Sequence, residues 1–129
     1  MRTKAMTTFA SILMAVLFTS CADRLVGSWT VQRFETTSPG QQGVKLTNIG
    51  TVEFKGDGSG VKKISYSAMG VTTNDLSPFK WKATEGKYVT IESDASALAK
   101  TWIVMENKKK FQKWKSTEGS NIQTIELKK

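Results

Sequence analysis

The sequence predicts an all-β fold in which about eight antiparallel strands form an up-and-down meander that closes into a small barrel. From Leu25 onward, apolar residues recur with a period of two, which is the period of a half-buried strand. Turn-forming residues interrupt this pattern roughly every eight to twelve positions, as in sandwiches and barrels. Such a meander must close or pack as two sheets to protect its edges, and we expect closure.

The first expected strand covers residues 25–35, and its inward residues alternate: Leu25, Gly27, Trp29 and Val31. The second covers residues 48–55, where Gly50, Val52 and Phe54 alternate with polar residues. Residues 56–60, Gly-Asp-Gly-Ser-Gly, lack the further acids of a calcium site and the lysine of a phosphate loop. They predict a hairpin turn.

The third expected strand covers residues 61–68, with Ile64, Tyr66 and Ala68 inward. A loop through Gly70 and Asn74-Asp75 leads to the fourth, where Phe79, Trp81 and Ala83 alternate with lysines. After a turn at Glu85-Gly86, a fifth strand covers residues 87–93. Residues 94–99 are long enough for one helical turn but too short for an independent helix.

The last three expected strands cover residues 100–107, 110–116 and 121–128. The first of them contains Trp102, Ile103, Val104 and Met105 in succession, so the pattern does not decide which face is inward. In the next, Phe111 and Trp114 have opposite parity. Either a bulge intervenes or one of the two aromatic side chains is exposed.

The first twenty residues have the order of a secretory signal peptide, because Arg2 and Lys4 precede an uncharged, largely apolar segment over residues 6–18. The uncharged run, residues 5–20, is shorter than the roughly 20 apolar residues that a membrane span needs. Ser20-Cys21 resembles the lipobox of bacterial lipoproteins. The resemblance implies that Cys21 becomes the acylated first residue of the mature protein.

This resemblance divides the chain into a signal peptide (1–20), a short anchor segment (21–24) and one β-barrel domain (25–129). It implies a lipid-anchored protein of the bacterial cell envelope, with the outer membrane as the expected location. Residues Ser20-Cys21-Ala22 also fit ordinary signal cleavage after Ala22. That alternative would release a soluble periplasmic or secreted protein.

Composition excludes most hydrolytic machinery, because the chain has no histidine and one cysteine. A Ser-His-Asp or Cys-His arrangement and an imidazole zinc site are therefore absent, and no disulfide can form within the chain. The acidic residues are scattered, and no catalytic set or metal site emerges from them. We expect a protein that is not an enzyme and that needs no cofactor.

The segment Leu25-Val26-Gly27-Ser28-Trp29 resembles the Leu-x-Gly-x-Trp opening of lipocalin-like domains, and residues 54–60 and 79–86 resemble two of their hairpins. The resemblance implies a barrel that binds a small hydrophobic or amphipathic molecule at its open end. META-type lipoprotein domains share the opening strand, so the topology stays open between the two. Gly27 and Trp29 are expected to close one barrel end.

Large aromatic residues dominate the expected interior, so we expect a small ligand or none rather than a capacious fatty-acid cavity. The candidate ligand-binding residues are Tyr66, Phe79, Trp81 and Trp102.

A basic run occupies residues 108–115, and its lysines are Lys108, Lys109, Lys110, Lys113 and Lys115. One interpretation is an edge strand that lysines protect against aggregation. The other is a surface that docks an anionic envelope component or an acidic partner, as an interaction module of META-like or inhibitor-like type would. The export signal argues against nucleic acid as the partner.

Overall fold

The computed structural model describes residues 24–129 except Met69, Ala95 and Gly119, so Cys21 and the expected signal peptide lie outside the described residues. The described part contains nine strands and no helix. Their bounds are β1 Gly27–Thr37, β2 Val44–Phe54, β3 Ser59–Ala68, β4 Val71–Asp75, β5 Phe79–Thr84, β6 Tyr88–Glu92, β7 Thr101–Lys108, β8 Phe111–Glu118 and β9 Asn121–Lys128. Within these residues, nothing helical is long and apolar enough to cross a bilayer.

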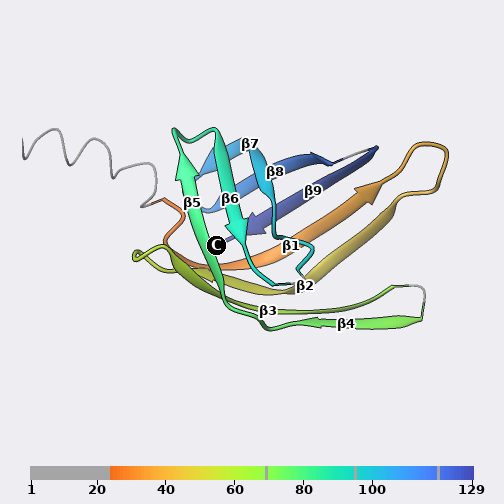
Figure 1. Cartoon of the computed structure of the whole chain (residues 1–129), viewed down its shortest axis with the longest axis horizontal. Helices are drawn as coiled ribbons and strands as arrows, with labels where there is room; N and C mark the ends of the chain where they lie inside the picture. The colour runs from red at the N-terminus through yellow and green to blue at the C-terminus, as the bar shows by residue number, and fades with distance from the viewer. Residues whose placement is uncertain (1–23, 69, 95, 119) are drawn as a thin grey trace, which may run out of the picture.

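Eight of the strands close into an antiparallel barrel (Figure 1). The barrel strands β1, β2, β3, β5, β6, β7, β8 and β9 each pair with the next in this order, and the barrel closes where β9 pairs with β1. The ninth strand, β4, lies beside β3. The predicted up-and-down barrel is therefore confirmed, with one additional strand.

The additional strand occupies a segment for which the sequence pattern predicted a loop. β4 and β5 pair with the same strand in one continuous register, since Asp75 lies opposite Ile64 and Phe79 lies opposite Gly60. The three residues between β4 and β5 end with Pro78, which has no N–H to donate to a ladder. The loop prediction over residues 70–75 was wrong because β-branched Val71, Thr72 and Thr73 favour a strand more than the neighbouring Asn-Asp pair opposes it.

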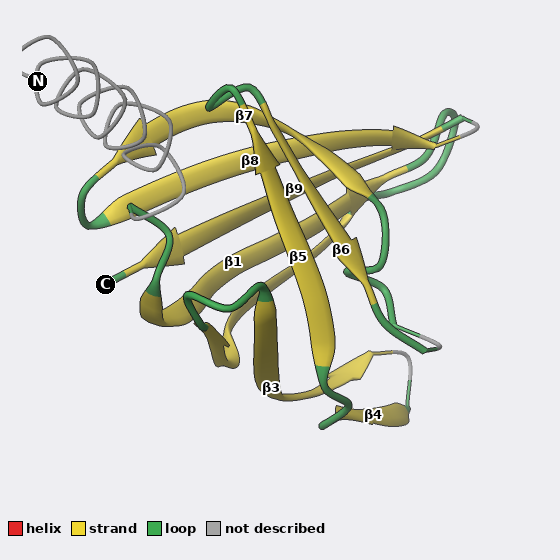
Figure 2. Ribbon diagram, turned by 60° about the vertical axis from the view of Figure 1, so that its left-hand side comes forward, coloured by secondary structure: helices red, strands yellow, loops and turns green. Residues whose placement is uncertain are grey.

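The alternating topology places two different sets of connections at the two ends of the barrel. One end, which we call the closed end, holds residues 24–26, the β2–β3, β5–β6 and β7–β8 turns, and Lys129. The other end, which we call the mouth, holds the connections β1–β2, β3–β4, β6–β7 and β8–β9. Figure 2 shows the start of β1 and the C-terminus together at the closed end.

Aromatic side chains fill the interior between the two ends. The ring of Phe54 makes edge contacts with Phe79 and Trp81, each at a centroid distance of 5.3 Å, and with Trp114 at 6.0 Å. Trp102 packs at 6.4 Å from Trp114. Each indole N–H has an acceptor inside the protein, as buried tryptophan requires.

The same local arrangement recurs at the two ends. The Trp29 indole N–H donates to the Leu25 carbonyl at 2.8 Å, and the Trp102 indole N–H donates to the Leu98 carbonyl at 3.0 Å. In each case a buried leucine lies four residues before the tryptophan, in the segment that enters a strand. The two tryptophans therefore tie the entries of β1 and β7 to the core.

The structure shows which side chains of β7 and β8 point into the barrel, a question that the sequence pattern left open. In β7, Trp102 is buried, whereas Ile103 and Met105 are exposed. In β8, Trp114 is buried and Phe111 is half-buried on the opposite face. β8 pairs with both β7 and β9, so it is not an edge strand. Edge protection therefore does not explain its lysines.

Candidate functional site

A cavity of about 270 Å³ opens at the mouth of the barrel, where β1, β2, β3, β4 and the β6–β7 connection meet. One side of it is apolar. The buried side chains on that side are Phe34, Ile49, Ile64 and Leu98. Leu76, which directly follows β4 and is 67% exposed, adds an apolar surface to the lining.

The other side of the cavity is polar, and β4 supplies most of it through Thr73, Asn74 and Asp75, followed by Ser77. Asp94 contributes a second carboxylate from the β6–β7 connection. An arrangement with one apolar and one polar wall suits a ligand that has an apolar body and a polar end.

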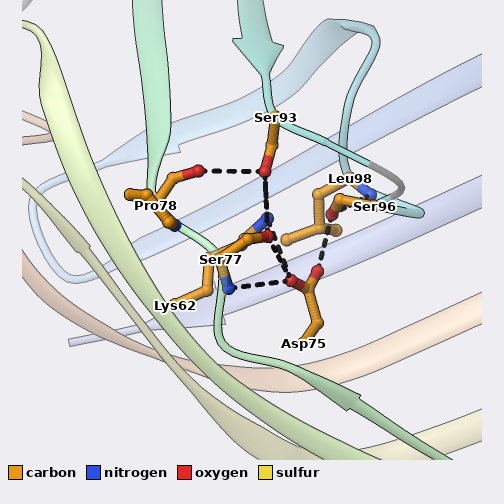
Figure 3. A network of polar contacts seen from close by, with 7 residues as sticks. All are labelled: Lys62, Asp75, Ser77, Pro78, Ser93, Ser96 and Leu98. Atoms are coloured by element: carbon orange, nitrogen blue, oxygen red, sulfur yellow. Dashed lines mark hydrogen bonds and ion pairs between the residues drawn. The ribbon is translucent and has the colours of Figure 1, made fainter.

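A partly buried polar network holds the polar wall in place, and it includes Asp75 and Ser77 of that wall (Figure 3). The Lys62 side chain is fully buried, and its ammonium lies 3.1 Å from Asp75 Oδ1 and donates to Ser93 Oγ at 2.7 Å. Asp75 also accepts hydrogen bonds from the hydroxyls of Ser77, at 2.8 Å, and Ser96, at 2.6 Å. The network fixes β4, the β4–β5 connection and the β6–β7 connection relative to β3.

Asp75 keeps its charge in this network. Burial raises the pKa of its carboxyl, but hydrogen bonds from Ser96, Ser77 and Lys62 together with the Lys62 charge outweigh burial, so the pKa is lowered from its ordinary value. Asp75 therefore stays ionised at neutral pH, and the buried ammonium keeps its counter-charge.

Lys62 is a residue that the sequence interpretation missed. Its parity within β3 is that of Ile64 and Tyr66, both of which were expected to face inward. Alternation alone places the side chain of Lys62 inside the barrel. The alternation that places Lys62 inward was present in the sequence. Lysine is rarely fully buried, so the residue was not assigned to the interior.

The four candidate ligand residues occupy different places. Tyr66 lines the mouth cavity and is partly buried against the core. Phe79 and Trp81 pack on Phe54 in the interior, and the Trp81 indole N–H donates to the Lys55 and Ser59 carbonyls of the β2–β3 turn. Trp102 is 0% exposed. The structure therefore brings Tyr66 alone among the four to the mouth cavity.

Trp29 lies at the closed end, where it is 1% exposed and the Lys129 ammonium lies 5.0 Å above its ring. Gly27, with a φ of 128°, precedes it in a backbone conformation that favours glycine. The first and last described residues, Arg24 and Lys129, lie at the same end of the barrel as Gly27 and Trp29.

The basic run divides between two surfaces. Lys108 is the last residue of β7, and Lys109 and Lys110 form the β7–β8 turn at the closed end. All three are exposed, and we call them the turn lysines. Lys113 and Lys115 lie on the wall of the barrel, where Lys113 pairs in register with Glu106 on β7 and with Glu126 on β9. Carboxylates on both sides thus oppose the charge of Lys113, whereas the turn lysines lie at the end of the sheet.

The β2–β3 turn is a hairpin turn held by Asp57, whose Oδ1 accepts hydrogen bonds from the Ser59 N–H at 2.9 Å and the Ser59 hydroxyl at 2.6 Å. These hydrogen bonds lower the pKa of Asp57. Among the described residues, no group of three acidic, cysteine or histidine side chains converges as a metal site would require.

Comparisons with known proteins support the fold. No protein-family profile matches the chain, and no curated protein is significantly similar to it in sequence. Among solved structures, the chain is similar to a redesigned β-barrel, with a TM-score of 0.50 and 15% sequence identity, over 84% of this chain and 94% of that one. The similarity shows a small β-barrel, and at this identity it concerns the fold alone.

Proposed function

We propose that this protein is a lipid-anchored protein of the bacterial envelope whose lipocalin-like barrel binds a small hydrophobic or amphipathic molecule at its mouth. The observation that carries the proposal is the mouth cavity, with Phe34, Ile49 and Ile64 on its apolar side and Asp75 and Ser77 on its polar side. The rest of the interior is filled by aromatic rings.

The volume of the cavity limits the size of the ligand. Small-molecule sites commonly measure about 300–1,000 Å³, and an eight-stranded barrel either fills itself or holds one small ligand. A cavity of about 270 Å³ lies just below that range. A long acyl chain would have to displace Trp102 or Trp114, which are buried in the core. We therefore propose a compact ligand.

The position of the N-terminal segment supports an anchored binding protein. Arg24 is held at the closed end by a hydrogen bond of 3.0 Å from its guanidinium to the Asn107 carbonyl. An acyl group on Cys21 would attach the protein through that end, opposite the mouth. The cavity would then open away from the membrane, where a ligand in the aqueous phase can reach it.

A fluorescence titration with the apolar probe N-phenyl-1-naphthylamine tests the ligand site. Ala97 is exposed and lines the cavity, so Ala97→Trp should fill the cavity without disturbing the core. We expect probe binding to wild type and at least a tenfold loss of affinity in Ala97→Trp, about 1.4 kcal/mol. Thr51→Trp, an exposed position on the outer wall, is the matched control and should bind as wild type does.

Two results would count against the site. Equal binding by Ala97→Trp and wild type would place the probe elsewhere, and absence of probe binding to the folded wild-type protein would remove the support for an apolar ligand. The acyl anchor is tested separately, by the intact mass of the mature protein, which shows whether the chain begins with a modified Cys21.

A further inference from the structure

The closed end of the barrel carries a basic surface that is larger than the lysine run in the sequence. We call it the closed-end basic surface, and its members lie before β1, at the C-terminus and at three turns: Arg24, Lys55, Lys87, Lys108, Lys109, Lys110, Lys128 and Lys129. All of them are exposed. Two exposed carboxylates, Asp57 and Glu85, lie in the same turns, and the eight cations outnumber them.

Hydrogen bonds hold Arg24 and the C-terminal residue Lys129 against the β7–β8 hairpin. Arg24 donates to the Asn107 carbonyl at 3.0 Å, and the Lys129 N–H donates to the Lys110 carbonyl at 2.9 Å. The Lys129 ammonium donates to the Val26 carbonyl at 2.9 Å. The turn is also fixed from inside the barrel, because buried Gln112 donates to Asn107 Oδ1 at 2.7 Å and to the Lys108 carbonyl at 3.1 Å. The cations are therefore gathered by the fold.

Structural roles do not account for the turn lysines. Edge protection is excluded because β8 is paired on both sides. The ion pairs between described residues join Arg33 to Glu35 and Glu126, and Lys62 to Asp75, so none of them involves the β7–β8 turn. The charge of Lys108, Lys109 and Lys110 is therefore available to an outside partner.

We propose that the closed-end basic surface lies on the anionic phospholipid head groups of the membrane that anchors Cys21, an inference that rests on the anchor in the proposed function. Successive Cα atoms lie about 3.8 Å apart, so the Cα of Cys21 is within about 11 Å of the Cα of Arg24 whatever path the chain takes. An acylated Cys21 sits at the membrane surface, so the closed end must lie beside it.

The Debye length at physiological ionic strength is about 8 Å, so the turn lysines would interact with the surface potential of anionic lipids when the closed end lies against the head groups. Each basic residue near such a surface contributes roughly fivefold to membrane affinity. The anchor and the basic surface would together fix the barrel upright, with its mouth away from the bilayer.

Amine labelling of the mature protein in vesicles tests this orientation. The protein is reconstituted in phosphatidylcholine vesicles with or without one quarter of phosphatidylglycerol, treated with the acetyl ester of N-hydroxysuccinimide, and analysed by peptide mass spectrometry. We expect several-fold slower labelling of Lys108, Lys109 and Lys110 in the anionic vesicles alone, and loss of this protection in 1 M salt, where the Debye length falls to about 3 Å. The reference lysines, Lys45 and Lys63 on β2 and β3, should label equally in both.

A triple variant with Lys108→Gln, Lys109→Gln and Lys110→Gln should lose most of the protection at Lys128 and Lys129. Its matched control changes three exposed wall lysines, Lys45→Gln, Lys63→Gln and Lys80→Gln, and should keep that protection. Circular dichroism confirms that both variants are folded.

The outcomes separate this proposal from the anchor. If the protein is acylated and its turn lysines label equally in both kinds of vesicle, the closed-end basic surface does not contact anionic lipid. That result would refute this proposal and leave the lipid anchor at Cys21 unaffected. Protection that appears only after an acidic envelope protein is added would assign the surface to a protein partner and overturn a lipid one. If the mature mass shows cleavage after Ala22, the anchor fails, and the surface stands only if the same lysines are protected when the soluble protein sediments with anionic vesicles.

Discussion

The ammonium of Lys62 lies 3.1 Å from Asp75 Oδ1 in the interior of the barrel, directly behind the polar wall of the mouth cavity. Lys62 belongs to β3 and Asp75 is the last residue of β4, so the pair joins the additional strand to the barrel. Because the Lys62 side chain is fully buried, the fold depends on Asp75 as the counter-charge of the Lys62 ammonium. The first two predictions follow from this dependence.

Replacing Asp75 with asparagine should strongly destabilise the protein. Asp75→Asn leaves a buried ammonium without its counter-charge, which typically costs about 3–5 kcal/mol. Lys62→Met should cost much less, because it removes the buried charge and leaves Asp75 with its hydrogen bonds from Ser77 and Ser96. Urea unfolding at pH 7 measures both free energies, and equal losses in the two variants would contradict the dependence.

The same carboxylate should contribute to the acid sensitivity of the fold. The pKa of Asp75 is lowered in the folded state, so its contribution to stability is fully present above the unfolded pKa of about 3.9 and is lost as pH falls through the lower folded value. Asp75→Asn lacks this group. The free energy of unfolding of the variant should therefore fall less than that of wild type between pH 5 and pH 2.5, and parallel curves would show that Asp75 is not responsible.

Gly60 should not tolerate a side chain. A Cβ at this position would overlap the Phe79 ring and lie 2.6 Å from the Glu53 carbonyl oxygen, where β2, β3 and β5 meet. Gly60→Ala is therefore expected to cost about 1–3 kcal/mol through overpacking. Gly56, in the adjoining turn, has open space at the corresponding position, so Gly56→Ala is the control and should remain within about 0.5 kcal/mol of wild type. Thermal unfolding compares the two.

Among the candidate aromatic residues, substitution of Trp102 in the core should reduce stability, whereas substitution of Tyr66 at the cavity should not. Trp102→Phe removes the hydrogen bond to the Leu98 carbonyl and leaves a void, so we expect a loss of about 2–4 kcal/mol. Tyr66→Phe keeps the ring and removes one hydroxyl at the cavity wall, and the stability should stay close to that of wild type. Denaturant unfolding of both proteins, followed by the probe titration, distinguishes loss of fold from loss of affinity.

The barrel could be predicted from the sequence because its walls obey simple alternation. Val52 and Phe54 are buried on β2, and Phe79 and Trp81 on β5, with polar residues between them. The pattern could not show the shift in β1, where a register change between Val31 and Arg33 makes Phe34, rather than Arg33, the next buried residue after Val31. Such a bulge depends on the partner strand, and no residue type signals it.

The candidate site was predicted less well than the fold. Ile64 of its apolar wall was expected to face inward, but Phe34 of the same wall is buried through the register shift in β1. Its polar wall depends on β4, a segment that the sequence pattern assigned to a loop. Gly50 shares the inward parity of Val52 and Phe54 but leaves no free space there. A Cβ at Gly50 would overlap the Lys63 carbonyl, so β2 and β3 approach closely at that point.

The central claim is that the mouth cavity, and not another surface, binds a small amphipathic molecule. Backbone amide chemical shifts of the nitrogen-15-labelled protein, measured during a titration with a small alkyl glycoside below its critical micelle concentration, test it most directly. We predict shifts confined to residues 64–66, 73–77 and 97–98, with saturation. Shifts confined to the outer wall or the closed end, or no saturable shifts at all, would contradict the account.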